Sequence, residues 1–226
     1  MFGLQIKYLS FFFGLISILS FFNIIYSYYL NLYLNLNTYY YSLLLSFTIS
    51  VLFYKIKILP RKISIFDKIL TVFLGYLIIP IILSIPFYFS IYNLTFLNSY
   101  FEAISGFTST GFSIFENIKH IDQSLILWRS STQWLGGLYF LFSIILLIDI
   151  YDENFKKTLT NFISFDSSEI FKQAIKIFLL YSVLTLIIFL ILNIFSIRAF
   201  NSLNLAFTLI SSGGFLPVND LSIILK

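Results

Sequence analysis

Two stretches of this chain, far apart in sequence, share one pattern. Asn98–Ser113 reads NSYFEAISGFTSTGFS, and Asn201–Leu216 reads NSLNLAFTLISSGGFL. They align without a gap, and every matched pair, such as Gly111 and Gly214, is 103 residues apart. Each stretch begins with an Asn-Ser pair, which favours a helix N-cap, and ends in hydroxyl residues and glycine. A repeat at one fixed separation indicates two copies of a single structural unit.

The composition around these copies is too apolar for a soluble domain. Of the 226 residues, 59% are hydrophobic and 11% are charged, whereas a soluble domain is about 45–50% apolar and about 25% charged. Such a chain cannot cover itself with polar surface, so we expect an all-α polytopic membrane protein. The chain has no cysteine and a single histidine, His120, which excludes a disulfide framework and argues against a transition-metal site.

Five stretches are long and apolar enough to cross a bilayer. About 20 apolar residues in a helix span a hydrocarbon core of about 30 Å. The expected spans are Tyr8–Leu30, Tyr39–Tyr54, Ile69–Tyr92, Ser124–Ile148 and Ile177–Ile197. The third span contains Pro80 and Pro86, which indicate either a tolerated kink or a functional hinge.

Lysine and arginine predict the orientation, because loops that face the cytoplasm carry an excess of both. The links between spans two and three and between spans four and five carry Lys55, Lys57, Arg61, Lys62, Lys68, Lys156, Lys157, Lys172 and Lys176. The N-terminus, with Lys7, is therefore expected on the cytoplasmic side. The links at 31–38 and 93–123 then face outward, and both repeated stretches follow a span on the outer side.

Each copy has about ten moderately apolar residues before its glycine, which are too few to cross the bilayer. This length predicts a re-entrant pore loop, in which a half-helix enters the membrane and an extended segment returns. Non-helical backbone persists at that depth only where it is buried in protein or lines a watery cavity. The alternative is a pair of outer loops with interfacial helices that end in Ser/Thr/Gly turns.

The chemistry of such loops favours conduction of a cation over catalysis. Glycine permits backbone angles that point successive carbonyl groups one way. Rings of carbonyl oxygens replace the hydration shell of a monovalent cation. The two half-helices would also direct the negative ends of their dipoles toward the same place.

Residues in and after the first copy resemble those of a known family. Phe101–Gly111 (FEAISGFTSTG) resembles the first pore loop of the Trk/Ktr/HKT superfamily of potassium transporters, and Leu127–Gly137 (LWRSSTQWLGG) resembles the start of the helix after it. Ser211–Phe215 (SSGGF) resembles the second pore loop. The likeness is greatest to the bacterial Trk-type membrane subunit and runs from about Asp67 to the C-terminus. The first two helices resemble an extra N-terminal pair that some members carry.

The resemblance implies helix–pore-loop–helix repeats of potassium-channel type, four around one pore, with one filter glycine in each. By position these glycines are Gly111 and Gly214, with Gly213 as the adjacent alternative for the second. The implied ion-binding residues of the selectivity filter, for K⁺ and not for a transition metal, are Thr108, Ser109, Thr110, Gly111, Ser211, Ser212, Gly213 and Gly214. The implied function is a membrane subunit of a K⁺ uptake system that has no covalent cofactor and is not an enzyme.

The resemblance also implies partners and a location. We expect a multi-pass protein of the bacterial inner (plasma) membrane, in contact with the lipid bilayer and paired as a homodimer. A nucleotide-binding regulatory subunit is expected at the cytoplasmic face. No nucleic acid is expected as a partner.

Four segments are expected along the chain. Residues 1–66 are an N-terminal helix pair with a basic loop, 67–150 the first repeat, 151–172 a cytoplasmic linker, and 173–226 a second repeat that stops after its pore loop. The family's later repeats have no counterpart, so the expected unit is incomplete, with about five spans and two re-entrant loops. The alternative function is therefore a truncated, non-conducting membrane fragment that needs the missing half or a partner chain.

Two charged residues lie in apolar surroundings, where each needs a partner. Glu102 is expected to accept hydrogen bonds from nearby backbone amides, the alternative being a negative potential near the filter. Arg129 either pairs with Glu102 or Glu116 or extends to the outer interface.

The remaining polar residues favour structural roles. Glu116, Lys119, His120 and Asp122 predict a solvated outer loop rather than an acid–base site, because no nucleophile motif or nucleotide-binding loop accompanies them. The residues Asp149, Asp152 and Glu153 predict a charged cytoplasmic turn. Gly136 and Gly137 predict close packing of the helix that carries them.

Overall fold

The computed structural model describes residues 3–56, 64–147 and 170–220, with side chains from residue 6 onward and, in the last range, from residue 175. Some of the sequence expectations fall elsewhere. Outside the described residues lie Lys57, Arg61, Lys62, Asp149, Asp152, Glu153, Lys156, Lys157, the side chain of Lys172 and most of the linker expected at 151–172.

Every regular element in the described residues is a helix. Their order is α1 (Gly3–Tyr29), α2 (Leu36–Lys55), α3 (Ile65–Leu83), α4 (Ile85–Tyr88), α5 (Phe96–Phe107), a 3₁₀ turn (Ile118–His120), α6 (Gln123–Leu147), α8 (Ile170–Ile194) and α9 (Ala199–Ile210). Five of these are long and apolar enough to cross a membrane, with α3 and α4 counted as one span. The prediction of an all-α protein with five spans is confirmed.

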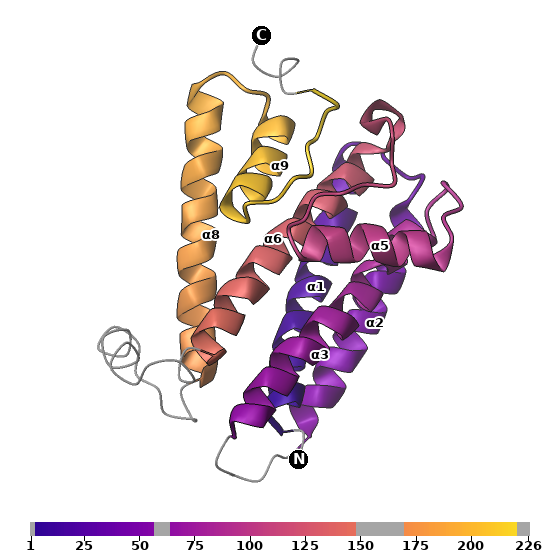
Figure 1. Cartoon of the computed structure of the whole chain (residues 1–226). Helices are drawn as coiled ribbons and strands as arrows, with labels where there is room; N and C mark the ends of the chain where they lie inside the picture. Colours follow the sequence, from indigo (N-terminus) through magenta and orange to yellow (C-terminus); the bar gives the residue numbers. More distant parts are fainter. Residues whose placement is uncertain (1–2, 57–63, 148–169, 221–226) are drawn as a thin grey trace.

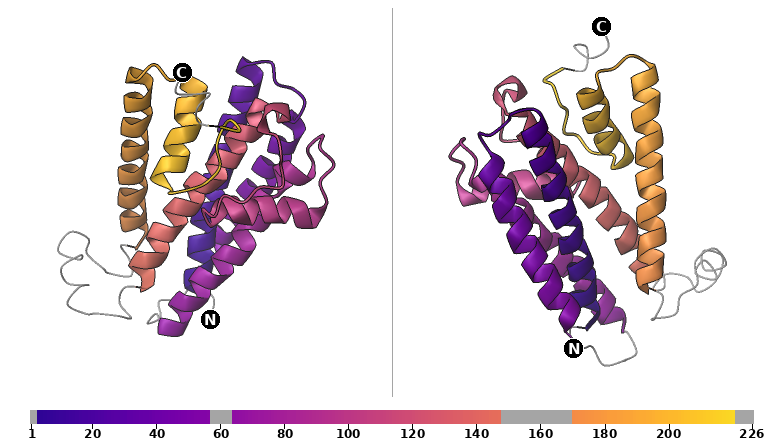
Figure 2. Two further views of the ribbon diagram at one scale, coloured as in Figure 1. Left: turned by 45° about the horizontal axis from the view of Figure 1, so that its top comes forward. Right: turned by 180° about the vertical axis from the view of Figure 1, so that it is seen from behind.

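The long helices run side by side, and α5 lies across them (Figure 1). The short helix α9 lies beside α8 and does not reach the other end of the bundle (Figures 1 and 2). Helix α1 starts at the end of the bundle farthest from α9 and from the loop after α5 (Figure 1). Both repeated stretches therefore lie toward one end of the molecule.

The third span breaks where its prolines predict a kink. Helix α3 contains Pro80 and ends at Leu83, and α4 starts after Ser84 with Pro86 in its first turn. A proline there loses no hydrogen bond, because the first N–H groups of a helix have no intrahelical acceptor. Ser64 starts α3 with a capping box, in which its hydroxyl accepts from the N–H of Asp67 at 3.1 Å.

The prediction that the Asn-Ser pairs cap the repeated helices is wrong. Helix α5 begins at Phe96, and its N-cap is Thr95, whose hydroxyl accepts from the N–H of Asn98 at 3.3 Å. Helix α9 begins at Ala199 after Arg198, which makes no side-chain cap hydrogen bond. Both helices therefore begin before the Asn-Ser pair, and in α5 the Thr95 hydroxyl takes the capping role.

Helix α6 is the central helix of the bundle. In its most apolar window 72% of the residues are buried, compared with 17% in α8. The ring of Phe12 in α1 packs edge-on against Tyr139 and Phe142 of α6, with ring centroids 4.8 Å and 5.4 Å away. The indole N–H of Trp128 donates to the carbonyl of Leu83 at 3.0 Å. These contacts fix α6 against the first and third spans.

The N-terminal pair is held together by hydroxyl groups as well as by apolar contact. Ser10 and Ser50 each donate to the other's backbone carbonyl, at 2.9 Å and 2.8 Å, and Ser20 donates to Ser42 at 3.1 Å. Small hydroxyl residues let membrane helices approach closely and bond across the interface.

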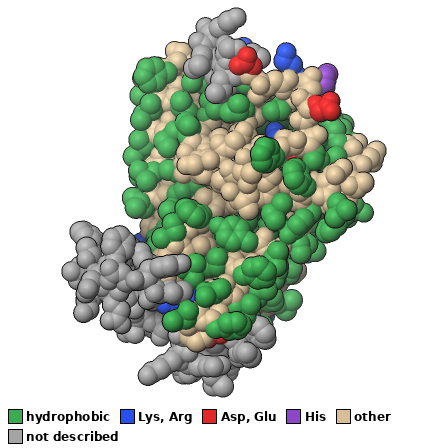
Figure 3. Space-filling view, in the orientation of Figure 1, with side chains coloured by type: hydrophobic (Ala, Val, Ile, Leu, Met, Phe, Trp, Pro, Cys, Tyr) green, Lys and Arg blue, Asp and Glu red, His purple; other side chains and the backbone are tan. Residues whose placement is uncertain are grey.

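The outer surface matches a membrane protein. Hydrophobic side chains extend over the flank of the molecule, and most of the charged side chains visible in Figure 3 lie toward its two ends. Large apolar side chains on α8 are exposed, among them Leu180 at 63% and Ile194 at 79%. Lipid tails can cover such a surface, whereas water cannot solvate it without cost.

Candidate ion-binding loops

The two repeated stretches form the same structure twice. Helices α5 and α9 each have 12 residues, and their first and last residues are separated by the same 103 positions as the sequence repeat. Ser105 donates from its hydroxyl to the carbonyl of Phe112 at 2.6 Å, and Thr208 donates to the carbonyl of Phe215 at 2.7 Å. One equivalent hydroxyl thus closes the loop in each copy, which explains why serine and threonine exchange there.

The turn after each helix has the same backbone strain. Ser109 has a φ of 56° and Ser212 a φ of 53°, so both lie in the left-handed region. This conformation costs a residue with a Cβ roughly 1–2 kcal/mol. Each serine stands in a Schellman cap: Ser109 and Ser212 donate to the carbonyls of Gly106 and Leu209, and the next N–H along the chain donates to Ser105 or Thr208.

The two loops meet at the matched glycines. Gly111 has a φ of 81°, and a Cβ built on it would collide with the backbone of Gly214. A Cβ on Gly214 would lie 2.9 Å from the Cα of Gly111. A Cβ on Gly213 would instead meet the side chain of Gln133. Of the two adjacent glycines, Gly214 is therefore the one that faces Gly111.

The backbone around these glycines has free acceptors. In the part of the chain that the structure describes, the carbonyl oxygens of the predicted filter residues accept no hydrogen bond; these residues are Thr108, Ser109, Thr110, Gly111, Ser211, Ser212, Gly213 and Gly214. Thr108, Thr110, Ser212 and Gly214 are exposed, whereas Ser211 is buried. Carbonyl groups without a protein donor are open to water or to an ion, so this group of oxygens can bind a cation.

One face of α6 supports both loops. Arg129, Thr132, Gln133, Gly136 and Gly137 follow one another at helical spacing and are all buried. Gly136 lies against the backbone of Phe107, so that any side chain there would collide with it. A Cβ on Gly137 would lie 2.8 Å from the Cβ of Ser211. The predicted close packing at these glycines is confirmed, and their neighbours are the C-terminal ends of α5 and α9 together with Tyr181 of α8.

Gln133 supports the second loop. Its amide oxygen accepts from the N–H groups of Gly214 at 2.9 Å and Phe215 at 2.7 Å, and its amide nitrogen donates to the Thr208 hydroxyl at 3.1 Å, in the orientation that satisfies both ends of the amide. Gln133 is fully buried. The sequence interpretation missed this role, although a carboxamide in the middle of a span is a signal that could have found it.

Glu102 supports the first loop. Its carboxylate accepts from the N–H of Ile114 at 2.9 Å and from the Ser113 hydroxyl, and it forms an ion pair with Arg129 Nε at 2.8 Å. The guanidinium also donates to Ser113 at 2.9 Å, and it lies 4.2 Å from the ring centroid of Phe215 in the other loop. The expected bonding of Glu102 to backbone amides is confirmed, and of the alternatives for Arg129 the structure has the pair with Glu102.

The outer loop has a structural network around one carboxylate. Asp122 Oδ2 accepts from the hydroxyl of Ser124 at 2.6 Å and from the amide of Asn35 at 3.3 Å, which ties the α1–α2 link to the start of α6. His120 and Glu116 are exposed. Among the described residues, no group of three or more His, Asp or Glu side chains is placed to hold a metal ion.

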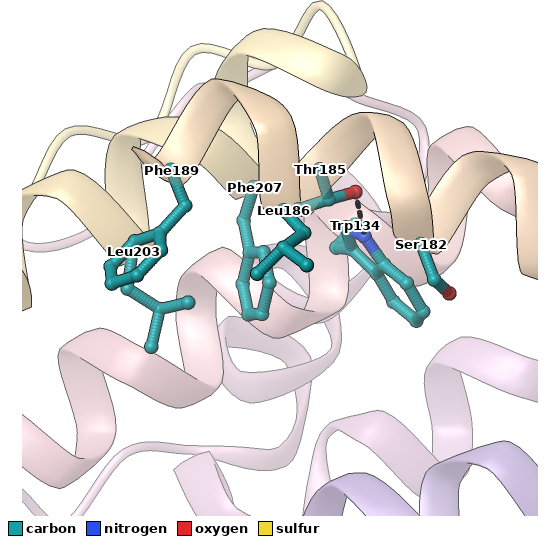
Figure 4. Close-up of a pocket in the computed structure, with 7 residues that line it drawn as sticks. All are labelled: Trp134, Ser182, Thr185, Leu186, Phe189, Leu203 and Phe207. Atoms are coloured by element: carbon teal, nitrogen blue, oxygen red, sulfur yellow. Dashed lines mark hydrogen bonds between the residues drawn. The ribbon is translucent and has the colours of Figure 1, made fainter. Parts of the chain in front are cut away.

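A separate apolar groove of about 280 Å³ lies between α6, α8 and α9 (Figure 4). Its walls include Trp134, Phe189 and Phe207, and the Trp134 indole donates to the hydroxyl of Thr185 at 2.9 Å. Its lining is almost wholly apolar, so it cannot replace the hydration shell of an ion. The free carbonyls of the two loops remain the candidate site.

No family model matches this chain. Its curated relatives include an uncharacterized cation transporter, MJ1485, of Methanocaldococcus jannaschii, 26% identical over 177 residues. That match covers 71% of this chain and 36% of the relative. The Trk system potassium uptake protein TrkI of Halomonas elongata is 37% identical over 60 residues, covering 26% of this chain and 11% of TrkI. TrkG of Escherichia coli is 35% identical over 46 residues, which are 20% of this chain and 10% of TrkG.

The fold has a solved counterpart. The potassium transporter TrkH from Vibrio parahaemolyticus matches with a TM-score of 0.76 and 17% identity, over 96% of this chain and 44% of TrkH. The chain thus spans less than half the length of these relatives. In sequence and in fold, this multi-pass membrane protein is similar to the N-terminal portion of the Trk-type cation transporters.

Proposed function

We propose that this chain is a membrane subunit of a monovalent-cation uptake system, with K⁺ as the transported ion. The backbone carbonyls of residues 108–111 and 211–214 form part of its selectivity filter. The observation that carries the proposal is the meeting of two equivalent loops at Gly111 and Gly214, with carbonyls that accept no hydrogen bond within the described chain.

The distribution of charge around the two loops also favours a monovalent cation. Both α5 and α9 end at their loops, so their C-terminal carbonyls add negative potential there. Carbonyl oxygens bind a dehydrated monovalent cation, as they do in potassium channel filters. The buried carboxylate of Glu102 is already paired with Arg129, which leaves the neutral backbone groups as ligands.

The orientation is part of the proposal. Lys55 ends α2 and Lys68 lies in the first turn of α3, and α1 starts at the same end of the bundle (Figure 1). Basic residues mark the cytoplasmic side. The N-terminus is then cytoplasmic, in the inner membrane of a bacterial cell, and the two loops face outward.

The complete uptake system contains more than these two loops. The remaining sides of the filter come from further transporter segments or from a second chain, and a homodimer and a cytoplasmic nucleotide-binding subunit are the proposed partners. The support is the likeness to proteins named for Trk systems, of which this chain covers only a part.

The test is K⁺ flux into proteoliposomes that contain the chain, alone and in the presence of the proposed partner. Gly111→Ser and Gly111→Arg are expected to change or abolish the flux while membrane insertion stays at the wild-type level. The matched control is Gly14→Ala, because Gly14 lies in α1 and a Cβ there would meet only Ser50 Oγ, at 3.3 Å. Unaltered flux in both Gly111 variants would refute the filter assignment. Absence of flux under all conditions would support the non-conducting alternative.

A further inference from the structure

In α6, the side chain of Arg129 makes polar or cation–π contacts with both loops. Its guanidinium donates to Glu102 and Ser113 on the side of the first loop. On the other side it stacks 4.2 Å from the ring centroid of Phe215, in the second loop. The side chain is 1% exposed. A rigid, planar cation thus fills the space between the two loops.

A further, exposed tie joins the segments that follow the two loops. Asn219 donates from its amide to Asn117 at 2.8 Å and accepts from the N–H of Ile118 at 2.8 Å. Water competes with exposed hydrogen bonds, so their net contribution is small. Charge-assisted bonds in a buried site are stronger and are also shorter and more directional. Arg129 thus holds the first loop through buried charge-assisted bonds and reaches the second through the Phe215 ring, beside the direct contact of the loops at Gly111 and Gly214.

We propose that Arg129 is a positioning residue that sets the distance between the two loops, and that it thereby determines how strongly the site prefers K⁺ over the smaller Na⁺. The preference for an ion rests on the proposed function, whereas the distance between the loops does not. Carbonyl groups select an ion by their number and spacing. A looser pair of loops lets the oxygens close around a smaller ion, so selectivity falls before conduction does.

The absence of cysteine from the whole sequence allows a direct measurement. The double substitution Asn117→Cys and Asn219→Cys places two thiols where the two amides touch, and the rate of disulfide formation under mild oxidation reports the distance between the loops. It also removes the exposed tie, so that the loops depend on Arg129. The disulfide assay uses the membrane-inserted chain without any partner, because it does not depend on ion transport.

Arg129→Lys is the decisive variant. Lysine keeps the charge beside Glu102 but loses the planar fork that reaches Ser113 and stacks on Phe215. We expect disulfide formation to slow by about tenfold, because the bond to Ser113 in the first loop and the contact with Phe215 in the second are both weakened. Arg198→Lys is the matched control, because Arg198 is exposed before α9. Equal rates in Arg129→Lys and Arg198→Lys would overturn the proposal.

A second variant protects the test against misfolding of the first. Phe215→Leu keeps an apolar side chain but removes the ring that the guanidinium contacts. We expect a smaller fall in the disulfide rate, about threefold, since only the cation–π contact is lost. If Phe215→Leu folds and reacts at the rate of the parent cysteine pair, the tie to the second loop is absent and the proposal fails.

Ion selectivity is measured in the cysteine-free chain. The ratio of K⁺ to Na⁺ flux is expected to fall in Arg129→Lys, with total flux retained, and to stay constant in Arg198→Lys. A constant ratio in both would overturn the link to selectivity. If no form conducts, the proposed function fails, and the disulfide rates alone decide whether Arg129 positions the loops.

Discussion

Replacement of Gly111 by alanine tests whether the two loops meet as the structure shows. The new Cβ would enter the backbone of Gly214, and φ at this position is 81°. The left-handed conformation costs alanine roughly 1–2 kcal/mol, and forcing an extra methyl into a packed site costs roughly 1–3 kcal/mol. We therefore expect Gly111→Ala to lower the free energy of unfolding by roughly 2–5 kcal/mol.

Two further glycines give a graded comparison. At Gly214 only the collision applies, with 2.9 Å between the new Cβ and the Cα of Gly111, so we expect a loss of roughly 1–3 kcal/mol. At Gly14, inside α1, the new Cβ meets Ser50 Oγ alone, at 3.3 Å. Alanine favours a helix over glycine by about 1 kcal/mol, so Gly14→Ala is expected to be neutral or slightly stabilising.

The chain contains its own reporter for this comparison. Its two tryptophans, Trp128 and Trp134, are both buried in α6 behind the loops. Equilibrium unfolding in mixed micelles, followed by tryptophan fluorescence, gives the free energy for each variant. If Gly111→Ala is as stable as Gly14→Ala, the loops do not touch at this glycine, and the geometry on which the filter proposal depends is wrong.

Two further predictions concern the packing that holds the loops. Gly136→Ala pushes a methyl group into the backbone of Phe107, and we expect a loss of roughly 1–3 kcal/mol in the same unfolding assay, with Gly14→Ala as the neutral reference. A stability equal to that reference would show that α5 does not rest on α6. Thr185→Val removes the acceptor of the Trp134 indole, which is 2.9 Å away, and is expected to cost about 1–2 kcal/mol and to shift the tryptophan emission. An unchanged spectrum would contradict that hydrogen bond.

Much of the fold could be predicted from local properties. Length and apolar content predict each span, because the thickness of a bilayer imposes the same requirement on every helix that crosses it. The repeat predicts two equal units, and the helices α5 and α9 follow it residue for residue. The helix starts were predicted less well. Thr95 lies just outside the aligned pattern, and it caps α5 in place of the Asn-Ser pair that was expected to do so.

The residues of the candidate site could be predicted from the sequence, but the contacts of the α6 side chains that hold its two loops could not. The pattern of glycine and hydroxyl residues identified both loops, because that chemistry is local. The role of Gln133 was missed because its amide oxygen accepts hydrogen bonds from a loop that lies 81 residues later in the chain, at Gly214. For Arg129 the sequence left open a pair with Glu102, a pair with Glu116 and extension to the interface. Only the packing of α5 against α6 selects Glu102, which is 27 residues away.

The sequence by itself thus determined that the chain crosses a membrane with five helices and carries two copies of one loop. Those properties depend on the hydrophobicity and spacing of neighbouring residues, which act over a few helical turns. The tertiary structure alone decided that the copies meet at Gly111 and Gly214, and that one face of α6 holds both. Contacts between distant segments depend on how the helices pack, and a single buried side chain such as Arg129 finds its partners only after they have done so.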